Sequence, residues 1–138
     1  MRKTVNTQWL GDMKFDSFVD GHHILVDVPS ESGENTAGPK PKTLLLTALA
    51  GCTGMDVVSL LKKMKVDIDS FTIEVTADET EEHPKHYSRM HIIYRFTGKD
   101  LPIDKIEKVI GLSQERYCGV SFMFRKAMEI THEIIIQE

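Results

Sequence analysis

Alternating side chains at the start of the chain predict three short β-strands. Strand-favouring residues recur at every second position over 5–9 and over 24–28, and two phenylalanines mark a third strand over 15–18. The dipeptides Gly11-Asp12 and Asp20-Gly21 have the composition of tight turns between such strands. We therefore expect the chain to begin with a meander of three strands.

A polar loop over 29–39, rich in Gly, Pro and Ser, leads into an apolar segment that predicts a helix from Pro41 to about Lys65. Because this helix is apolar on nearly every side, it must be covered on nearly every side. We expect a sheet to cover one side and a second copy of the chain to cover another, in a homodimer. Gly51 and Gly54 leave a smooth patch on the helix. This patch is explained either by tight packing or by a functional contact.

The second half of the chain alternates between strand and helix patterns. Apolar residues alternate over 71–77 and over 90–96, on either side of a charged connection, which predicts a long hairpin. Helical patterns follow over 100–111 and 113–128, and 130–136 is typical of a closing strand. The predicted order is β-β-β-α-β-β-α-α-β, an α+β fold with antiparallel sheet.

The length of 138 residues suits one domain spanning residues 1–138. The net charge of −4, without any cluster of Lys and Arg, argues against a nucleic-acid partner. Polar residues within the apolar helix, among them Thr47, Thr53 and Asp56, favour a buried helix of a soluble protein over a membrane span. The first residues carry no apolar stretch of the signal-peptide kind, so we expect a cytoplasmic protein without membrane association.

The chain has two cysteines, Cys52 within the apolar helix and Cys118 ahead of the last helical pattern. A thiol redox centre requires two thiols, one to attack and one to resolve. Burial would raise the pKa of the Cys52 thiol, and Asp56 at i+4 would oppose its ionisation. Cys118 lies next to Arg116, a more electropositive setting. The residues alone leave open whether the two thiols pair or simply fill core volume.

These motifs resemble the OsmC/Ohr superfamily, the osmotically inducible and organic hydroperoxide resistance proteins. The resemblance rests on Pro41 eleven positions before Cys52 and on the run from Leu44 to Cys52. The segments Gly51–Leu61 and Leu112–Cys118 are especially similar to the YhfA-like branch. The similarity extends over nearly the whole chain.

The resemblance implies an OsmC-like fold, in which antiparallel sheets wrap around long central helices in an intertwined homodimer. It also implies a peroxidase cycle with two catalytic cysteines. Cys52 would attack the peroxide bond and become a sulfenic acid, and Cys118 would condense with it to a disulfide that a dithiol reductant reduces. The apolar helix faces suit an organic hydroperoxide better than hydrogen peroxide.

The chain departs from the best-characterised members in the residues that activate the thiol. Those members carry a glutamate directly after the helix proline, where this chain has Lys42, and an arginine in the first hairpin, where it has only Met13 or Lys14 nearby. We hypothesise that Lys42 or Lys14 supplies a compensating cation. If the activating pair is simply lost, the alternative is a non-catalytic dimer that binds a small lipophilic or thiol ligand, or a structural dimer with inert cysteines.

The six histidines lie far apart in the chain, and we expect neither a metal nor another cofactor. They are His22, His23, His83, His86, His91 and His132. Only His83 and His86 are closely spaced, in the charged connection of the predicted hairpin. Without a matching cysteine or carboxylate cluster, surface imidazoles are the simpler interpretation.

Overall fold

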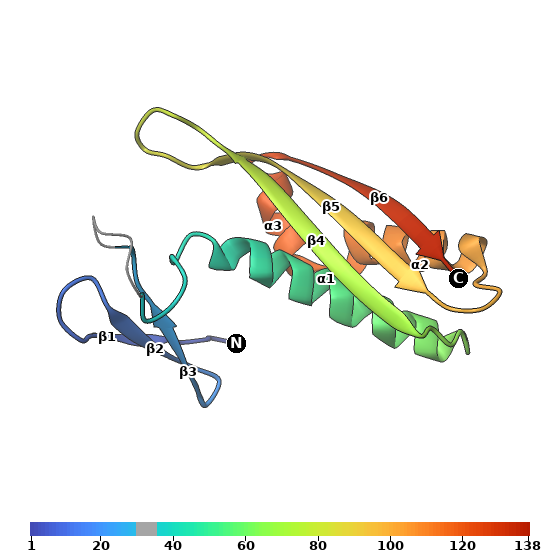
Figure 1. Cartoon of the computed structure of the whole chain (residues 1–138), viewed down its shortest axis with the longest axis horizontal. Helices are drawn as coiled ribbons and strands as arrows, with labels where there is room; N and C mark the ends of the chain where they lie inside the picture. The colour runs from blue at the N-terminus through green and yellow to red at the C-terminus, as the bar shows by residue number, and fades with distance from the viewer. Residues whose placement is uncertain (30–35) are drawn as a thin grey trace. The chain divides into compact units, whose positions relative to one another are not determined.

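The computed structural model describes residues 1–29 and 36–138, so most of the predicted 29–39 loop lies outside the described part. The chain divides into two compact units, 1–45 and 46–138 (Figure 1). The order of helices and strands matches the predicted α+β order.

The first unit contains an antiparallel sheet in the order β1-β2-β3. Its strands are β1 (Asn6–Trp9), β2 (Phe15–Val19) and β3 (His22–Val26). Asp20 and Gly21 join β2 to β3 with positive φ angles of 48° and 80°, the backbone of a type I′ hairpin turn. The predicted meander is therefore confirmed.

One face of this sheet is apolar, and no other described residue of the first unit covers it. Trp9 pairs with Phe15, and Phe15 pairs with Val26, so the three side chains share a face. Ile24, two positions before Val26 on the same strand, lies on that face as well. Trp9 is 63% exposed, and Phe15 and Ile24 are each 37% exposed. An isolated three-stranded sheet of this kind needs a partner for its apolar face.

Helix α1 (Leu44–Lys63) begins three residues after the predicted start at Pro41, whose carbonyl accepts a hydrogen bond from the Leu44 N–H at 3.1 Å. The helix ends because Lys65 has a positive φ of 58°. The Val66 N–H then reaches back to the Leu61 carbonyl at 2.9 Å, as in a Schellman motif.

Only one stripe of α1 is buried in the single chain: Leu49, Thr53, Val57 and Leu61, at intervals of four residues. Met55 and Val58, outside this stripe, are 76% and 48% exposed. By length and hydropathy α1 could cross a membrane. Its buried stripe instead joins the core of the second unit, which is the behaviour of a core helix.

The second unit contains a sheet in the order β4-β5-β6, with helices against one face (Figure 1). Its strands are β4 (Ser70–Glu79), β5 (Tyr87–Thr97) and β6 (Glu129–Gln137). The β4–β5 pair is antiparallel, as predicted for the hairpin, but β5 and β6 are parallel. The prediction of antiparallel pairing is therefore wrong for this pair. The helical connection returns the chain to the start of β5, and β6 then runs in the same direction.

The helical connection differs from the two predicted helices, 100–111 and 113–128. Helix α2 (Ile103–Leu112) does not end at Gly111 but continues into a π-helical turn, η1 (Ser113–Tyr117). The Cys118 N–H closes this turn on the Ser113 carbonyl at 2.8 Å. Cys118 itself has an extended backbone and starts α3 (Gly119–Arg125). The helical break thus falls at the cysteine, and π-turns of this kind are frequent at functional sites.

The core of the second unit lies between α1, the inward face of β5, and α2. Its strand side chains are Met90, Ile92, Tyr94 and Phe96, each at most 1% exposed. The Phe71 ring of β4 stacks on Phe96, with ring centres 4.4 Å apart. Cys118 belongs to this core, and Cys52 packs against it.

Candidate functional site

The structure brings the two cysteines of the second unit together. Cys52 is half-buried on α1, and Cys118, between η1 and α3, is 3% exposed. Both thiols are free. Cys52 packs against the core that contains Cys118 and lies near enough to raise the pKa of the Cys118 thiol. Two thiols that are distant in the sequence therefore share one site.

Burial raises the pKa of the Cys118 thiol above its usual value. Hydrogen bonds from the backbone and side chain of Ser121 act in the opposite direction, and the neighbouring Cys52 raises the pKa further. The Ser121 N–H lies 3.4 Å from the Cys118 sulfur. The sequence-based expectation of an electropositive setting is wrong, because Arg116 lies instead over the Tyr117 ring, 5.8 Å from its centre.

Asp56, one turn beyond Cys52, is half-buried and accepts a hydrogen bond from the Ser113 hydroxyl at 3.0 Å. It also lines a small cleft of about 180 Å³ that includes Lys63 and Tyr117. The carboxylate predicted to share the face of Cys52 is thus tied to the segment that carries Cys118.

Lys14 and Lys42, the candidate thiol-activating cations, belong to the first unit. Lys14 takes part in the turn before β2, where its N–H bonds to the Gly11 carbonyl at 3.0 Å. Lys42 precedes α1, and its carbonyl accepts from the Leu45 N–H at 3.1 Å. Their role in activating Cys52 stays a prediction.

A buried network of polar side chains surrounds the thiol pair, and the sequence reasoning missed it. The Thr53 hydroxyl lies 2.7 Å from the Tyr94 hydroxyl and 2.8 Å from the Ser113 hydroxyl. The Gln114 side-chain amide donates to the Tyr94 oxygen at 2.6 Å and to the Thr53 oxygen at 3.3 Å. Burial raises the pKa of Tyr94, and the hydrogen bonds from Thr53 and Gln114 oppose that shift.

Arg125 holds the far end of this network. Its guanidinium donates to the side-chain oxygen and to the backbone oxygen of Gln114, at 2.7 Å each. The Ser121 hydroxyl donates to the same side-chain oxygen at 3.1 Å. Among the described residues, every buried side-chain nitrogen and oxygen has a partner. The network is therefore fully satisfied, the condition under which buried polar groups make a rigid core.

A sequence signal for this network exists in the hydrophobic pattern. Thr53 occupies a position in the buried stripe of α1, and Tyr94 lies at an inward position of β5. A polar group at a core position needs a buried partner. Which partners those are depends on η1, whose π-helical turn the sequence pattern did not predict.

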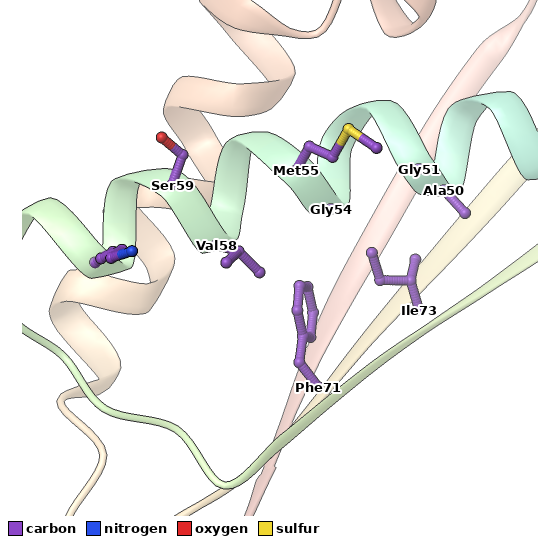
Figure 2. Close-up of a pocket in the computed structure, with 9 residues that line it drawn as sticks. Ala50, Gly51, Gly54, Met55, Val58, Ser59, Phe71 and Ile73 are labelled. Atoms are coloured by element: carbon purple, nitrogen blue, oxygen red, sulfur yellow. The ribbon is translucent and has the colours of Figure 1, made fainter. Parts of the chain in front are cut away.

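An apolar groove of about 730 Å³ lies between α1 and β4 (Figure 2). Phe71 and Ile73 of β4 face the helix across it (Figure 2). A Cβ atom at Gly54 would lie 2.8 Å from the Cδ1 atom of the Ile73 side chain, whereas a Cβ at Gly51 would meet nothing within 4 Å. The smooth patch predicted on the helix is thus explained by packing at Gly54 only. The residues that line this groove do not include either cysteine.

No group of three or more His, Cys, Asp and Glu residues comes together within residues 1–29 and 36–138. His23 bonds to Asp16 at 3.0 Å, and His91 bonds to Glu133 at 3.2 Å. Burial lowers the pKa of His132, and the nearby Arg125 lowers it further. His23 and His91 thus make pairwise contacts with carboxylates, whereas His132 packs edge-on against the Tyr94 ring.

The fold and the site define an α+β protein with one buried and one half-buried cysteine at the same core. The family model described as OsmC-like protein matches residues 32–133. The chain is also 33% identical over 126 residues to Protein YhfA from Escherichia coli strain K12, covering 91% of each sequence. The chain therefore belongs to the OsmC-like family, as the resemblance of its motifs indicated.

Solved structures support the same fold. A hypothetical protein from Aquifex aeolicus VF5 superposes with a TM-score of 0.84 at 27% identity, covering 100% of this chain and 99% of that one. The organic hydroperoxide resistance protein OhrB of Bacillus subtilis superposes with a TM-score of 0.69 at 18% identity, covering 97% of this chain and 98% of that one. The OhrB likeness concerns the fold alone.

Proposed function

We propose that this protein is a cysteine-dependent peroxidase that reduces organic hydroperoxides through a disulfide between Cys52 and Cys118. The observation that carries the proposal is the interaction of two free thiols within one core. The half-buried Cys52 is the more accessible sulfur and acts as the attacking thiol. The buried Cys118 acts as the resolving thiol.

The cycle has three steps. The Cys52 thiolate attacks the O–O bond of a hydroperoxide, which leaves a sulfenic acid on Cys52 and an alkoxide that takes up a proton to become an alcohol. The Cys118 thiolate then attacks the sulfenic sulfur, so a disulfide forms and hydroxide leaves, to be protonated to water. A dithiol reductant finally restores both thiols and is itself oxidised to a disulfide.

Two observations support an organic hydroperoxide as the substrate. The thiol pair lies against an apolar core, where an alkyl chain gains free energy by leaving water. OhrB, which shares the fold, is named for organic hydroperoxide resistance. The cycle requires both thiols to be reduced at its start, a state that the reducing cytoplasm maintains.

We further propose that the protein works as a homodimer. No other described residue of the first unit covers the apolar face of the β1–β3 sheet. Phe122 and Met123 of α3 are also 62% and 60% exposed. Exposed apolar surface on each unit marks an interaction site, and a second copy offers a partner of the same chemistry.

The test is to treat the reduced protein with an organic hydroperoxide and measure its intact mass. The expected product has lost two hydrogens and two maleimide-reactive thiols. Cys52→Ser should abolish the reaction, because the attacking sulfur is gone. Cys118→Ser should stop it at the sulfenic acid, which a dimedone probe traps on Cys52. Methionine oxidation adds an oxygen mass instead and is thereby distinguished.

If neither cysteine reacts faster than the free thiol of a small peptide, the peroxidase proposal is wrong. The apolar groove between α1 and β4 then favours the second candidate, a non-catalytic dimer that holds a small lipophilic ligand. Native mass spectrometry of the purified protein would detect such a ligand, and Val58→Asp in the groove should release it.

A further inference from the structure

The hydroxyl groups around the thiol pair form a chain whose hydrogens all point one way. Ser113 donates its single hydrogen to the Asp56 carboxylate, so its oxygen must accept from Thr53. The Thr53 hydrogen is then used, so the Thr53 oxygen accepts from the Tyr94 hydroxyl. The Tyr94 oxygen in turn accepts from the Gln114 amide. The donor and the acceptor of every hydrogen bond in this series are therefore fixed.

Arg125 fixes the start of this chain. Its guanidinium only donates, so the Gln114 atom that it contacts must be the side-chain oxygen. The amide nitrogen of Gln114 then points at Tyr94, as the chain requires. The second bond from Arg125, to the Gln114 backbone oxygen, holds the π-helical turn itself. The orientation of Gln114 is therefore determined from both sides.

This chain connects the two segments that carry the cysteines. Thr53 follows Cys52 directly on α1, and Asp56 lies one turn beyond. Ser113 accepts the Cys118 N–H at its carbonyl, while its side chain bonds to α1. Ser121 contacts both the Cys118 sulfur and the Gln114 oxygen. A shift of η1 against α1 would break several of these bonds at once.

We propose that Gln114 and Tyr94 are positioning residues of the thiol site: they lock η1 to α1 so that the Cys118 sulfur faces the Cys52 sulfur in bonding geometry. The proposal rests on the proposed function and deepens it. Neither residue has to touch the hydroperoxide. They hold the two cysteine backbones at the separation and orientation that a disulfide requires, and a disulfide tolerates little displacement of either backbone.

A role in filling the core does not by itself explain why the side chains at positions 94 and 114 are polar. Apolar side chains of similar shape fill a core about as well as a buried hydrogen-bonded group, since the net gain from such a bond is small. What hydrogen bonds add is direction, and a network of this kind specifies one arrangement of the segments it joins. We therefore expect variants of the network to change the equilibrium constant for disulfide formation by more than their loss of folding stability explains.

The test measures the equilibrium between the reduced protein and glutathione disulfide, which yields the Cys52–Cys118 disulfide and two molecules of glutathione. Tyr94→Phe and Gln114→Leu should each lower this equilibrium constant by at least about tenfold, because Tyr94→Phe removes two hydrogen bonds of the network and Gln114→Leu removes four. Ile92→Val is the matched control. It removes one buried methylene two positions from Tyr94 on the same strand, and should lower the melting temperature while leaving the constant unchanged.

Thr53→Ser and Thr53→Val provide a second measurement that does not depend on either of those variants folding. Thr53→Ser keeps the hydroxyl and should retain the wild-type equilibrium constant for disulfide formation. Thr53→Val removes the hydroxyl and should lower that constant. The proposal is overturned if the Tyr94, Gln114 and Thr53→Val variants change the constant by less than about twofold. It is equally overturned if wild-type protein forms no disulfide with glutathione. Failure of the hydroperoxide reaction with the disulfide equilibrium intact contradicts only the peroxidase function.

Discussion

At the residue scale, the contrast between the two thiols supports the proposed attacking role of Cys52 and resolving role of Cys118. Cys118 is enclosed by the core, and its pKa is raised by burial, with only Ser121 stabilising the thiolate. A thiol of this kind stays protonated at neutral pH and reacts mainly with a partner already beside it. This is the behaviour that a resolving cysteine needs.

Alkylation by iodoacetamide tests that contrast. We expect Cys118 to be modified more slowly than Cys52 and to gain reactivity only as the pH rises above the usual pKa of a thiol. Ser121→Ala should slow Cys118 further at any given pH, because the thiolate loses a hydrogen bond that lowers its pKa. Peptide mapping separates the two sites. Ser59→Ala, on the exposed part of α1, is the control, and equal rates in the two variants would contradict the assignment.

Thr53 tests the energetic weight of the network. Thr53→Val keeps the shape of a fully buried side chain but removes the acceptor of the Tyr94 hydroxyl and the donor to the Ser113 oxygen. We expect the free energy of unfolding in urea to fall by about 1–3 kcal/mol. Thr72→Val, on the exposed face of β4, should change it by less than about 0.5 kcal/mol. Equal effects would mean that the network does not stabilise the fold.

At the element scale, each helix of the second unit buries one face and leaves the other to solvent or to a partner. On α2, Ile106 is 0% exposed and Ile103 is 53% exposed. The two positions lie one turn apart on the same side of the helix, so they differ in burial because Ile103 is at the exposed start of α2.

We therefore expect Ile106→Ala to lower the free energy of unfolding by about 2–5 kcal/mol, because it leaves a cavity in the core. Ile103→Ala should cost under about 1 kcal/mol. Urea unfolding of both variants at the same protein concentration makes the comparison. If Ile103→Ala proves equally costly, a second copy covers that face of α2.

At the scale of the whole molecule, the uncovered face of the β1–β3 sheet is the feature that needs an explanation. A face made of Trp9, Phe15, Ile24 and Val26 is more apolar than one expects for a surface in water. The homodimer proposal accounts for it, since the same residues of a second copy are equally available for burial.

Ile24→Asp places a charge on this face and should shift the protein from dimer to monomer in sedimentation velocity experiments, because the carboxylate would be buried unpaired. Asn6→Asp adds the same charge to the opposite face, since Asn6 pairs with Phe18, and should leave the dimer intact. A wild-type protein that sediments as a monomer at micromolar concentration would overturn the dimer.

The sequence by itself determined the element order, the strand positions and the OsmC-like family, because these depend on local periodicity and on motifs that are contiguous in the chain. It also made Cys52 and Cys118 the candidate catalytic residues, because thiol chemistry requires a specific residue type, and that assignment stays a prediction. Helix ends were predicted less well, as at Gly111, where a turn pattern was overridden by the π-helical continuation.

Only the tertiary structure decided which groups surround the thiols. Tyr94, Gln114 and Arg125 come from three different elements, β5, η1 and α3, and their bonds depend on how η1 packs against α1 and β5. The burial that raises the pKa of Cys118 also arises from packing, which reversed the electropositive setting predicted from its neighbour Arg116. Local sequence reports what a residue is able to do, whereas burial and partners, which are properties of the folded chain, decide what it does.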